Sequence, residues 1–392
     1  MGGAKTPGVR VPRNEKEIVA FSDLACVAFG VALELGRKQI TKLDAEMIRI
    51  AHSGRSIAGG LVIYPMAQWF GGRCVPTGGI GVVAVAPQHR ARGVGARLMR
   101  AAVTELHRQR TPLSTLYPAT LALYRQAGYE IAGGRYEITL MPRSVRLRDR
   151  EFEVRAIRPQ DQAALAAAHR RAVRWSNGPL DLQSPGWRKA MAAWGKPTRG
   201  YALWEGSEVA GFFRHLVEFP EETLRVTELF VDRPAAARRM LTLLADHRFQ
   251  VEKISWFGSP ADPLLPLLAE PGYRVRLHDH WMLRITDVER ALSERGYPLG
   301  LEAQLDLEVR DELLAGNNDR FQLEIGGGRG RVRRGGRGRI RIDVRGLAVL
   351  YSGHLSPQEL RMRTEYLDAS PEQCARLQPV FAGSAPWLAE NF

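Results

Sequence analysis

The stretch from Val83 to Ala96 constrains the fold more than any other part of the chain. Its sequence is Val-Ala-Val-Ala-Pro-Gln-His-Arg-Ala-Arg-Gly-Val-Gly-Ala. The alternating apolar start predicts a strand, the arginines and glycines predict a tight basic turn, and residues 94–108 continue as a helix with one apolar face. A strand, a short turn and a helix in direct succession are typical of an α/β layer structure.

The turn of this motif has the features of an anion site. Free backbone N–H groups at the start of a helix, together with the helix dipole, attract negative charge. Gly93 and Gly95 would let a pyrophosphate approach the main chain, and Arg90 and Arg92 would add positive charge. The sequence therefore predicts a pyrophosphate-binding loop here. An ordinary turn that carries surface arginines is the alternative.

The length of 392 residues predicts two or three domains, because one core of that size is uncommon. No apolar stretch approaches the roughly 18 residues of a membrane helix, and the start lacks the pattern of a secretory signal. Cys26, Cys74 and Cys374 are odd in number and far apart, which is typical of a reducing compartment. We expect a cytoplasmic protein that has no membrane partner.

Strands and helices alternate through the first two thirds of the chain. After helices within residues 15–55, the strands expected in the first unit cover residues 57–64, 68–76, 80–85, 113–117 and 136–141. A weaker copy of the same order follows the charged connector 143–155, with helices at 159–175 and 235–247, which suggests an internal duplication. The motif of the copy, Leu229 to Arg239, lacks the glycines and predicts a scaffold without a cofactor. The last third reads as a separate α+β domain.

Half of the net charge of +14 lies in one short segment. Residues 326–345 contain eight arginines and Asp343, which gives +7. Arg/Gly segments bind RNA through charge and guanidinium stacking, but this one lacks interleaved aromatic residues. It also lies between the strand-like segments 321–325 and 340–344. We therefore favour a solvated hairpin over a nucleic-acid site.

A second motif runs Ala-Leu-Tyr-Arg-Gln-Ala-Gly-Tyr from Ala122 to Tyr129. Together with the first motif, it resembles the GNAT superfamily of N-acetyltransferases. The resemblance implies that the backbones of Val83, Ala84 and Val85 bind the pantetheine of acetyl-CoA. It also implies that Tyr124 lies near the thioester sulfur, where a phenol with a pKa of about 10 can protonate the departing thiolate. The residues implied to wrap the pyrophosphate are Arg90, Ala91, Arg92, Gly93, Val94, Gly95 and Ala96.

The order of domains resembles the enhanced-intracellular-survival (Eis) family of acetyltransferases over essentially the whole chain. The residues that carry this resemblance are Gln68–Arg73, Pro76–Thr77, the Arg90–Ala96 loop, Tyr124 and the terminal Phe392. It implies a C-terminal domain similar to sterol carrier protein, whose final α-carboxylate enters the first unit and assists proton removal from the amine. It further implies a homo-oligomer, a hexamer in this family. Asn391 and Gly95 depart from the Eis pattern, so the resemblance does not fix aminoglycosides as substrates.

These observations predict tandem GNAT-fold domains, one active and one degenerate, followed by a sterol-carrier-like α+β domain, with boundaries at 1–145, 146–285 and 286–392. The expected activity is acetyl transfer from acetyl-CoA to a primary amine: a small-molecule amine, an aminoglycoside-like compound or a lysine. No metal is expected, because His278 and His280 share a strand face without a nearby third ligand. The alternative is a non-catalytic or nucleic-acid-binding protein that retains the fold.

Overall fold

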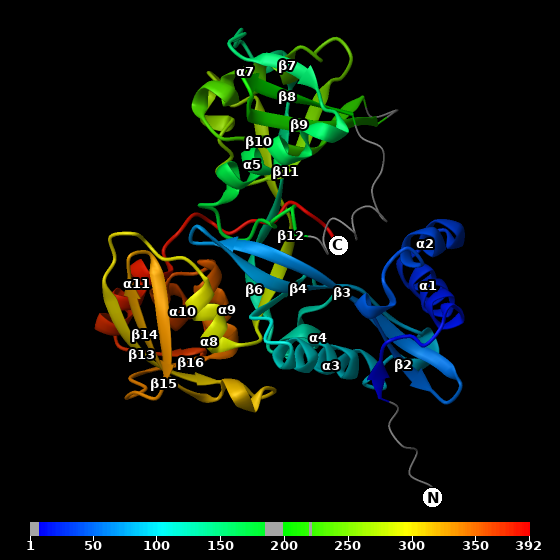
Figure 1. Cartoon of the computed structure of the whole chain (residues 1–392), viewed down its shortest axis with the longest axis vertical. Helices are drawn as coiled ribbons and strands as arrows, with labels where there is room; N and C mark the ends of the chain where they lie inside the picture. Colours follow the sequence, from blue (N-terminus) through cyan, green and yellow to red (C-terminus); the bar gives the residue numbers. More distant parts are fainter. Residues whose placement is uncertain (1–7, 185–198, 219–221) are drawn as a thin grey trace, which may run out of the picture.

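The computed structural model of the chain describes residues 8–184, 199–218 and 222–392. Its elements form three units, of which two share one twelve-stranded sheet and the third has a five-stranded sheet of its own. In Figure 1 the first unit lies at the lower right, the second at the top and the third at the lower left, with the C-terminus between them.

The first unit wraps helices around a strongly bent sheet. Its helices are α1 (Glu15–Phe29), α2 (Leu33–Ile40), α3 (Val94–Arg108) and α4 (Leu121–Arg125). Its strands are β1 (Val9–Arg10), β2 (Ile48–Ser53), β3 (Ser56–Phe70), β4 (Arg73–Val85), β5 (Leu113–Leu116) and β6 (Glu130–Leu140). The buried face of α3 presents Leu98, Met99 and Leu106 to this sheet. The helix predicted over residues 94–108 is therefore confirmed.

The strands before the motif differ from the sequence expectation. The three strands expected over 57–85 are two long ones, β3 and β4, and the middle segment contains the hairpin that joins them. Gly71 (φ 59°) and Gly72 (φ 90°) make this turn, because the left-handed region favours glycine. Residues 48–53, expected as helix, form β2, which pairs with β3. Local apolar spacing could not distinguish one long strand from two short ones.

The second unit continues the same sheet. It contains β7 (Glu153–Ala156), α5 (Gln162–Val173), β8 (Arg199–Glu205), β9 (Glu208–Glu218), β10 (Thr223–Val231), α7 (Pro234–Ala245), β11 (Lys253–Gly258) and β12 (Tyr273–Ile285). Strand β12 lies between β5 and β6 of the first unit, and the end of β6 pairs in turn with β11. The two units therefore exchange strands and cannot separate without breaking the sheet.

The third unit packs four helices on its own sheet, in the strand order β15-β14-β13-β16-β17. Its elements are α8 (Val288–Glu294), β13 (Ala303–Arg310), β14 (Asp319–Gly326), β15 (Arg329–Arg334), β16 (Ile340–Asp343), α9 (Val344–Ser352), α10 (Pro357–Arg363), β17 (Leu367–Asp368) and α11 (Pro371–Phe381). A buried ion pair joins it to the first two units, since Arg284 of β12 bonds Asp311 at 2.7 Å. Helix α9 packs against β12 and β6.

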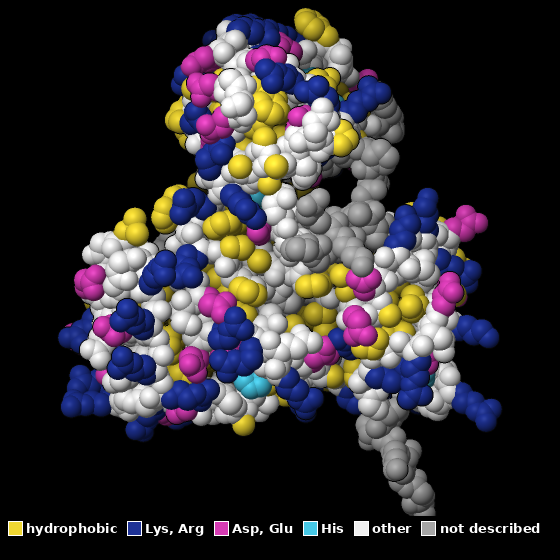
Figure 2. All heavy atoms as spheres, in the orientation of Figure 1, with side chains coloured by type: hydrophobic (Ala, Val, Ile, Leu, Met, Phe, Trp, Pro, Cys, Tyr) yellow, Lys and Arg dark blue, Asp and Glu magenta, His cyan; other side chains and the backbone are white. Residues whose placement is uncertain are grey.

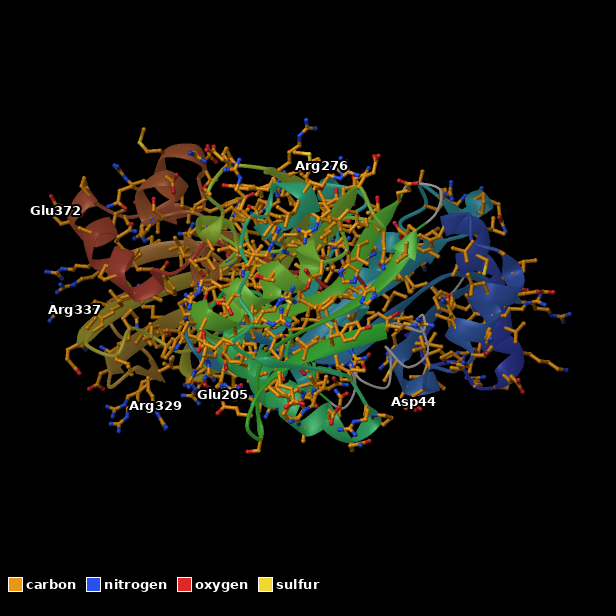
Figure 3. The ribbon with its side chains drawn as sticks, turned by 90° about the horizontal axis from the view of Figure 1, so that it is seen from above. Asp44, Glu205, Arg276, Arg329, Arg337 and Glu372 are labelled. Carbon is orange, nitrogen blue, oxygen red and sulfur yellow. The ribbon has the colours of Figure 1, made fainter. Side chains whose placement is uncertain are left out.

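The Arg/Gly segment forms a strand as well as a turn. Strand β15 pairs with β14 through a tight turn at Gly327 and Gly328, so the expected hairpin closes earlier than predicted. Arg334 bonds Asp319 at 2.8 Å, while Arg329 and Arg337 point outward from the third unit (Figure 3). On the face drawn in Figure 2, Lys and Arg side chains occur on all three units with acidic side chains among them.

Candidate active site

The site predicted from the first motif lies where β4 and β5 separate. Their parallel pairing runs from Thr77 opposite Leu113 to Ile80 opposite Leu116 and then stops. Beyond Ile80, β3 is the one described strand that pairs with β4 as it continues to Val85. The last residues of β4 therefore present backbone N–H and C=O groups to the gap between β4 and β5, as an edge strand does.

A bulge in β4 changes the direction of this edge. Gly60 pairs with Ala84 and Val62 with Gly81, so that two residues of β4, Val82 and Val83, oppose the single intervening residue of β3. Val82 has a φ of 52°, which is strained for a β-branched residue. Such strain is typical of functional sites. The glycines of the flanking pairs, Gly60 and Gly81, do not distinguish a bulge from a plain strand, so the bulge was not predicted from the sequence.

The loop after β4 ends in an uncapped helix start. Gly93, at the N-cap of α3, has a φ of 74° and makes no side-chain capping bond. Ala91 is also left-handed, with a φ of 56°, while Val94 is buried and anchors the helix. Arg90 and Arg92 are exposed, and the ion pairs of the described residues include neither of them. These donors and charges fit an anionic group such as a pyrophosphate.

Tyr124 lies on α4, close to the same loop. A Cβ built on Gly95 would lie 3.4 Å from the side chain of Leu123, so α4 packs against the first turn of α3. The Tyr124 side chain is 4% exposed, and burial raises its pKa, which a hydrogen bond with the backbone of Ala119 partly offsets. Its ring meets that of Tyr129 edge to face, with 6.4 Å between centroids.

The chain terminus lies against β4. A Cβ placed on Gly81 would be 2.9 Å from the carboxyl carbon of Phe392, one residue before the strained Val82. The Phe392 ring packs on Tyr117 and Tyr64, with centroid distances of 5.7 and 6.1 Å. The structure therefore brings Phe392 to the bulge of β4, and places α4, which carries Tyr124, against the first turn of α3.

Backbone bonds hold the tail in this position. The Tyr117 hydroxyl lies 3.1 Å from the carbonyl of Leu388 and 2.8 Å from that of Glu390, and Arg135 donates to the carbonyl of Ala389 at 3.0 Å. Burial raises the pKa of Tyr117 well above its usual value, so this phenol remains a donor. Tyr117 and Arg135 were not predicted from the sequence, because an aromatic at a strand end and a lone arginine carry no motif.

A cavity of about 250 Å³ adjoins the terminus. It lies between α1 and α2 and also reaches Val82, Asn391 and Phe392. The other residues that line it are Ala25, Cys26, Phe29, Val31, Gly36, Gln39 and Ile40. Among the described residues its wall is therefore mostly apolar, and the terminal carboxylate is the one formal charge that they contribute.

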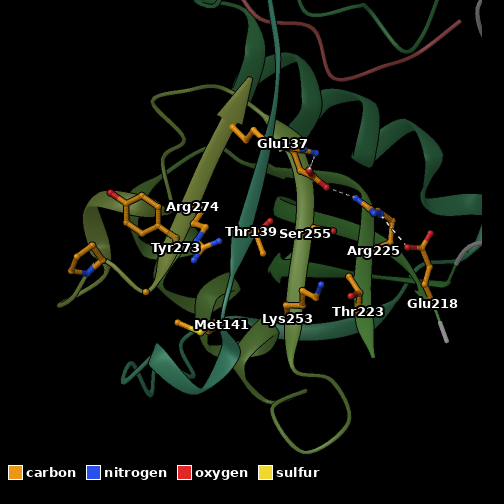
Figure 4. A pocket seen from close by; sticks show the side chains of 13 residues that line it. Glu137, Thr139, Met141, Glu218, Thr223, Arg225, Lys253, Ser255, Tyr273 and Arg274 are labelled. Atoms are coloured by element: carbon orange, nitrogen blue, oxygen red, sulfur yellow. Dashed lines mark hydrogen bonds and ion pairs between the residues drawn. The ribbon is translucent and has the colours of Figure 1, made fainter. Parts of the chain in front are cut away.

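A larger cavity, of about 800 Å³, lies elsewhere, on the sheet face of the second unit (Figure 4). It is lined by polar side chains of β6, β10, β11 and β12 and contains none of the predicted site residues. Size alone therefore does not identify the active site.

In the second unit, the turn before α7 corresponds to the Arg90–Ala96 loop of the first unit, but it lacks the features that would bind a pyrophosphate. Helix α7 begins at Pro234, without a glycine turn, and Asp232 bonds Arg171 at 2.7 Å and Arg233 at 2.8 Å. In the described parts of the chain, no three His, Cys, Asp or Glu side chains are grouped to hold a metal ion. His278 instead bonds Asp279 at 2.7 Å.

Comparison with known proteins gives the same three units. Residues 11–132 and 166–285 each match an acetyltransferase (GNAT) domain model, and residues 288–389 match a sterol carrier protein domain. The chain is 30% identical over 336 residues to N-acetyltransferase Eis of Mycobacterium tuberculosis, covering 80% of this chain and 79% of that one.

Solved structures agree over nearly the full length. A GCN5-related N-acetyltransferase from Anabaena variabilis superposes with a TM-score of 0.92 at 30% identity, covering 98% of this chain and 99% of that one. Eis1 from Mycobacterium abscessus shares the fold, with a TM-score of 0.79 at 24% identity over 98% and 100% of the two chains. None of the helices described here is long and apolar enough to cross a membrane.

Proposed function

The chain belongs to the Eis-like acetyltransferases of the GNAT superfamily, and from this we propose that it transfers the acetyl group of acetyl-CoA to a primary amine by direct attack. The observation that carries the proposal is the contact of the terminal carboxyl of Phe392 with Gly81, at the bulge of β4. An anion at this point can hold an ammonium group beside the strand edge where a thioester would bind.

The residues of the first unit fit acetyl-CoA, which supplies an activated acetyl thioester when bound. Val83, Ala84 and Val85 would bind the pantetheine through the unpaired side of β4. The loop from Arg90 to Ala96 would hold the pyrophosphate with backbone N–H groups and two arginines. A backbone N–H at the bulge would polarise the thioester carbonyl.

Two residues would move protons. The Phe392 carboxylate would orient the ammonium and help to remove its proton, directly or through water, since a terminal carboxyl of pKa about 3.5 is a weak base. Tyr124 would protonate the departing sulfur. Burial raises the pKa of this phenol, which keeps it in the protonated form that an acid needs.

The cavity between α1 and α2 supports a compact acceptor. Phe29, Val31 and Ile40 would contact the body of the amine, while the terminal carboxylate would meet its charged end. The acidic side chain nearest along α1, Asp23, bonds Arg37 at 2.6 and 2.7 Å and so offers little attraction to a polycation. An amine with one charge and an apolar body fits this wall better than an aminoglycoside.

Thiol release from acetyl-CoA, measured across arylalkylamines, polyamines, aminoglycosides and lysine peptides, tests the activity. We expect turnover with at least one primary amine and the highest kcat/KM with the apolar monoamines. Absence of turnover with every class would contradict the proposed activity. A preference for polycations would contradict only the assignment of the acceptor.

We also propose the domain boundaries 1–145, 146–285 and 286–392, a cytoplasmic location and a homo-oligomer, a hexamer by family resemblance. The first boundary falls after β6, which already belongs to the sheet of both units. Light scattering on the purified chain tests the hexamer. Binding of nucleic acid by residues 326–345 has less support, because Arg334 and Arg345 already bond acidic neighbours.

A further inference from the structure

A row of polar side chains crosses the four strands that line the large cavity of the second unit. Arg274 of β12 lies opposite Thr139 of β6, which lies opposite Ser255 of β11, which lies opposite Arg225 of β10. Neighbouring strands are about 4.8 Å apart, so the row spans roughly 14 Å, with two hydroxyls at its centre. Figure 4 shows the four side chains on one side of the ribbon.

The charges of this cavity do not balance. Its lining contains four basic side chains and two acidic ones. Glu137 bonds Arg225 at 2.9 Å and Arg276 at 2.7 Å, and Glu218 lies 3.4 Å from Arg225. Lys253 and Arg274 have no acidic partner within the described residues. Two positive charges therefore remain beside the central hydroxyls.

The hydroxyl of Ser255 points to a missing partner. This residue is 3% exposed, and its Oγ makes no hydrogen bond with any residue that the structure describes. A buried hydroxyl without a partner costs about 1–3 kcal/mol, so such groups are rare unless something binds them. Lys253, Thr139 and Arg225 all line the cavity with it, and together they present mainly donors.

We propose that this sheet face is a second ligand site, distinct from the acetyl-CoA site, that binds the phosphate group of a small molecule. A phosphate carries close to two negative charges near neutral pH and accepts several hydrogen bonds, which matches two free cations and a donor hydroxyl. The oxygens would accept from Ser255 and Thr139 at the centre of the row. Lys253 and Arg274 would neutralise the charge from either side.

Calorimetry on the full-length chain tests this site, with inorganic phosphate in one arm and glycerol 3-phosphate in the other. We expect the double variant Lys253→Gln/Arg274→Gln to weaken binding at least tenfold. The matched control, Arg329→Gln/Arg331→Gln, removes the same charge from the exposed strand β15 and should bind as the parent does. Tighter binding of the ester would identify a phosphorylated metabolite rather than free phosphate as the ligand.

The single variant Ser255→Ala separates a binding role from a structural one. It removes a buried hydroxyl that lacks a partner, so the unfolding midpoint in urea should stay the same or rise, while phosphate affinity should fall several-fold. Equal binding by the parent and both double variants would overturn the site. A fall in the stability of Ser255→Ala with unchanged phosphate affinity would also overturn it. A change of oligomeric state in these variants would do the same, because it would make this face a contact between copies of the chain.

Discussion

Among single residues, hydrogen bonding distinguishes three of the tyrosines near the site, Tyr117, Tyr124 and Tyr129. Ser114 donates to the carbonyl of Gly78, so the Tyr129 hydroxyl, 2.7 Å away, must donate to Ser114. Tyr117 donates to the chain tail. The bond between Tyr124 and the backbone of Ala119 lowers the pKa of the phenol, so the hydroxyl accepts it and keeps its own proton available. Of these three phenols, Tyr124 is therefore the one suited to act as an acid.

Replacing Tyr124 by Phe should lower kcat about 100-fold or more, the usual scale for loss of a general acid, with little change in the affinity for acetyl-CoA. The phenyl ring preserves the packing on Tyr129, so the free energy of unfolding should fall only by the roughly 1 kcal/mol of the lost bond with the backbone of Ala119. The matched control is Tyr129→Phe, which removes a buried hydrogen bond. It should cost about 1 kcal/mol of stability and leave kcat near normal. Unchanged turnover in Tyr124→Phe would make this residue structural.

Glu390 predicts a pH dependence of stability. Burial, with a smaller contribution from the nearby Glu228, raises its pKa to about 7. A carboxyl whose pKa is higher in the folded state favours folding at low pH, and this contribution is lost as the pH rises through about 7. Glu390→Gln should therefore gain roughly 1–2 kcal/mol relative to wild type between pH 6 and pH 8. Urea unfolding at both pH values measures this difference. A constant difference would mean that Glu390 is ionised throughout.

At the scale of secondary structure, the sequence predicted elements that depend on local pattern. The spacing of Leu98 and Leu106 predicted α3, and the glycines of the first motif predicted the turn before it. A strand was expected around His278 and His280, but the placement of β12 between β5 and β6 was not, because it depends on pairing across more than a hundred residues of chain. The bulge at Val82 was not predicted either. It lies just beyond Ile80, where the pairing of β4 with β5 ends, and that position depends on pairing between distant segments.

The start of α3 gives a prediction about coenzyme binding. Gly93→Glu should abolish the heat of acetyl-CoA binding, because it puts a carboxylate where the pyrophosphate would approach. The positive φ of residue 93 also strains any side chain placed there, and this strain is unrelated to coenzyme binding. Gly206→Glu controls for this strain, since Gly206 also has a positive φ (61°) with no atom within 4 Å of its Cβ position, but lies in the β8–β9 turn. The control should lose similar stability and bind normally. Equal affinity in both variants would remove the loop from the site.

In the whole molecule, three units meet along the last residues of the chain. The segment 386–392 bonds Gly134 of β6 through Pro386 and Leu388, and Trp387 bonds the carbonyl of Asn177 in the second unit. Glycine is required where the tail crosses, because a Cβ on Gly178 would lie 2.4 Å from the carbonyl of Trp387. Phe392 is thereby fixed from the third unit at the site of the first. The domain order suggested this from sequence, but the path of the tail depends on contacts from all three units.

The terminal carboxylate gives the prediction that depends on the whole assembly. A C-terminal tag should impair acetylation at least tenfold, because it replaces the charge beside Gly81 with a neutral amide, whereas an N-terminal tag should not. Deletion of Phe392 should also impair the enzyme, since the new carboxylate on Asn391 falls about 3.5 Å short along the chain. Phe392→Leu keeps the charge and should retain most activity, although it loses the ring contacts with Tyr117 and Tyr64. Steady-state rates with one good amine compare these four proteins with the untagged enzyme. If the C-terminally tagged enzyme matched the untagged one, the carboxylate would have no part in proton removal, and the base would have to be sought among the other groups around the cavity of α1 and α2.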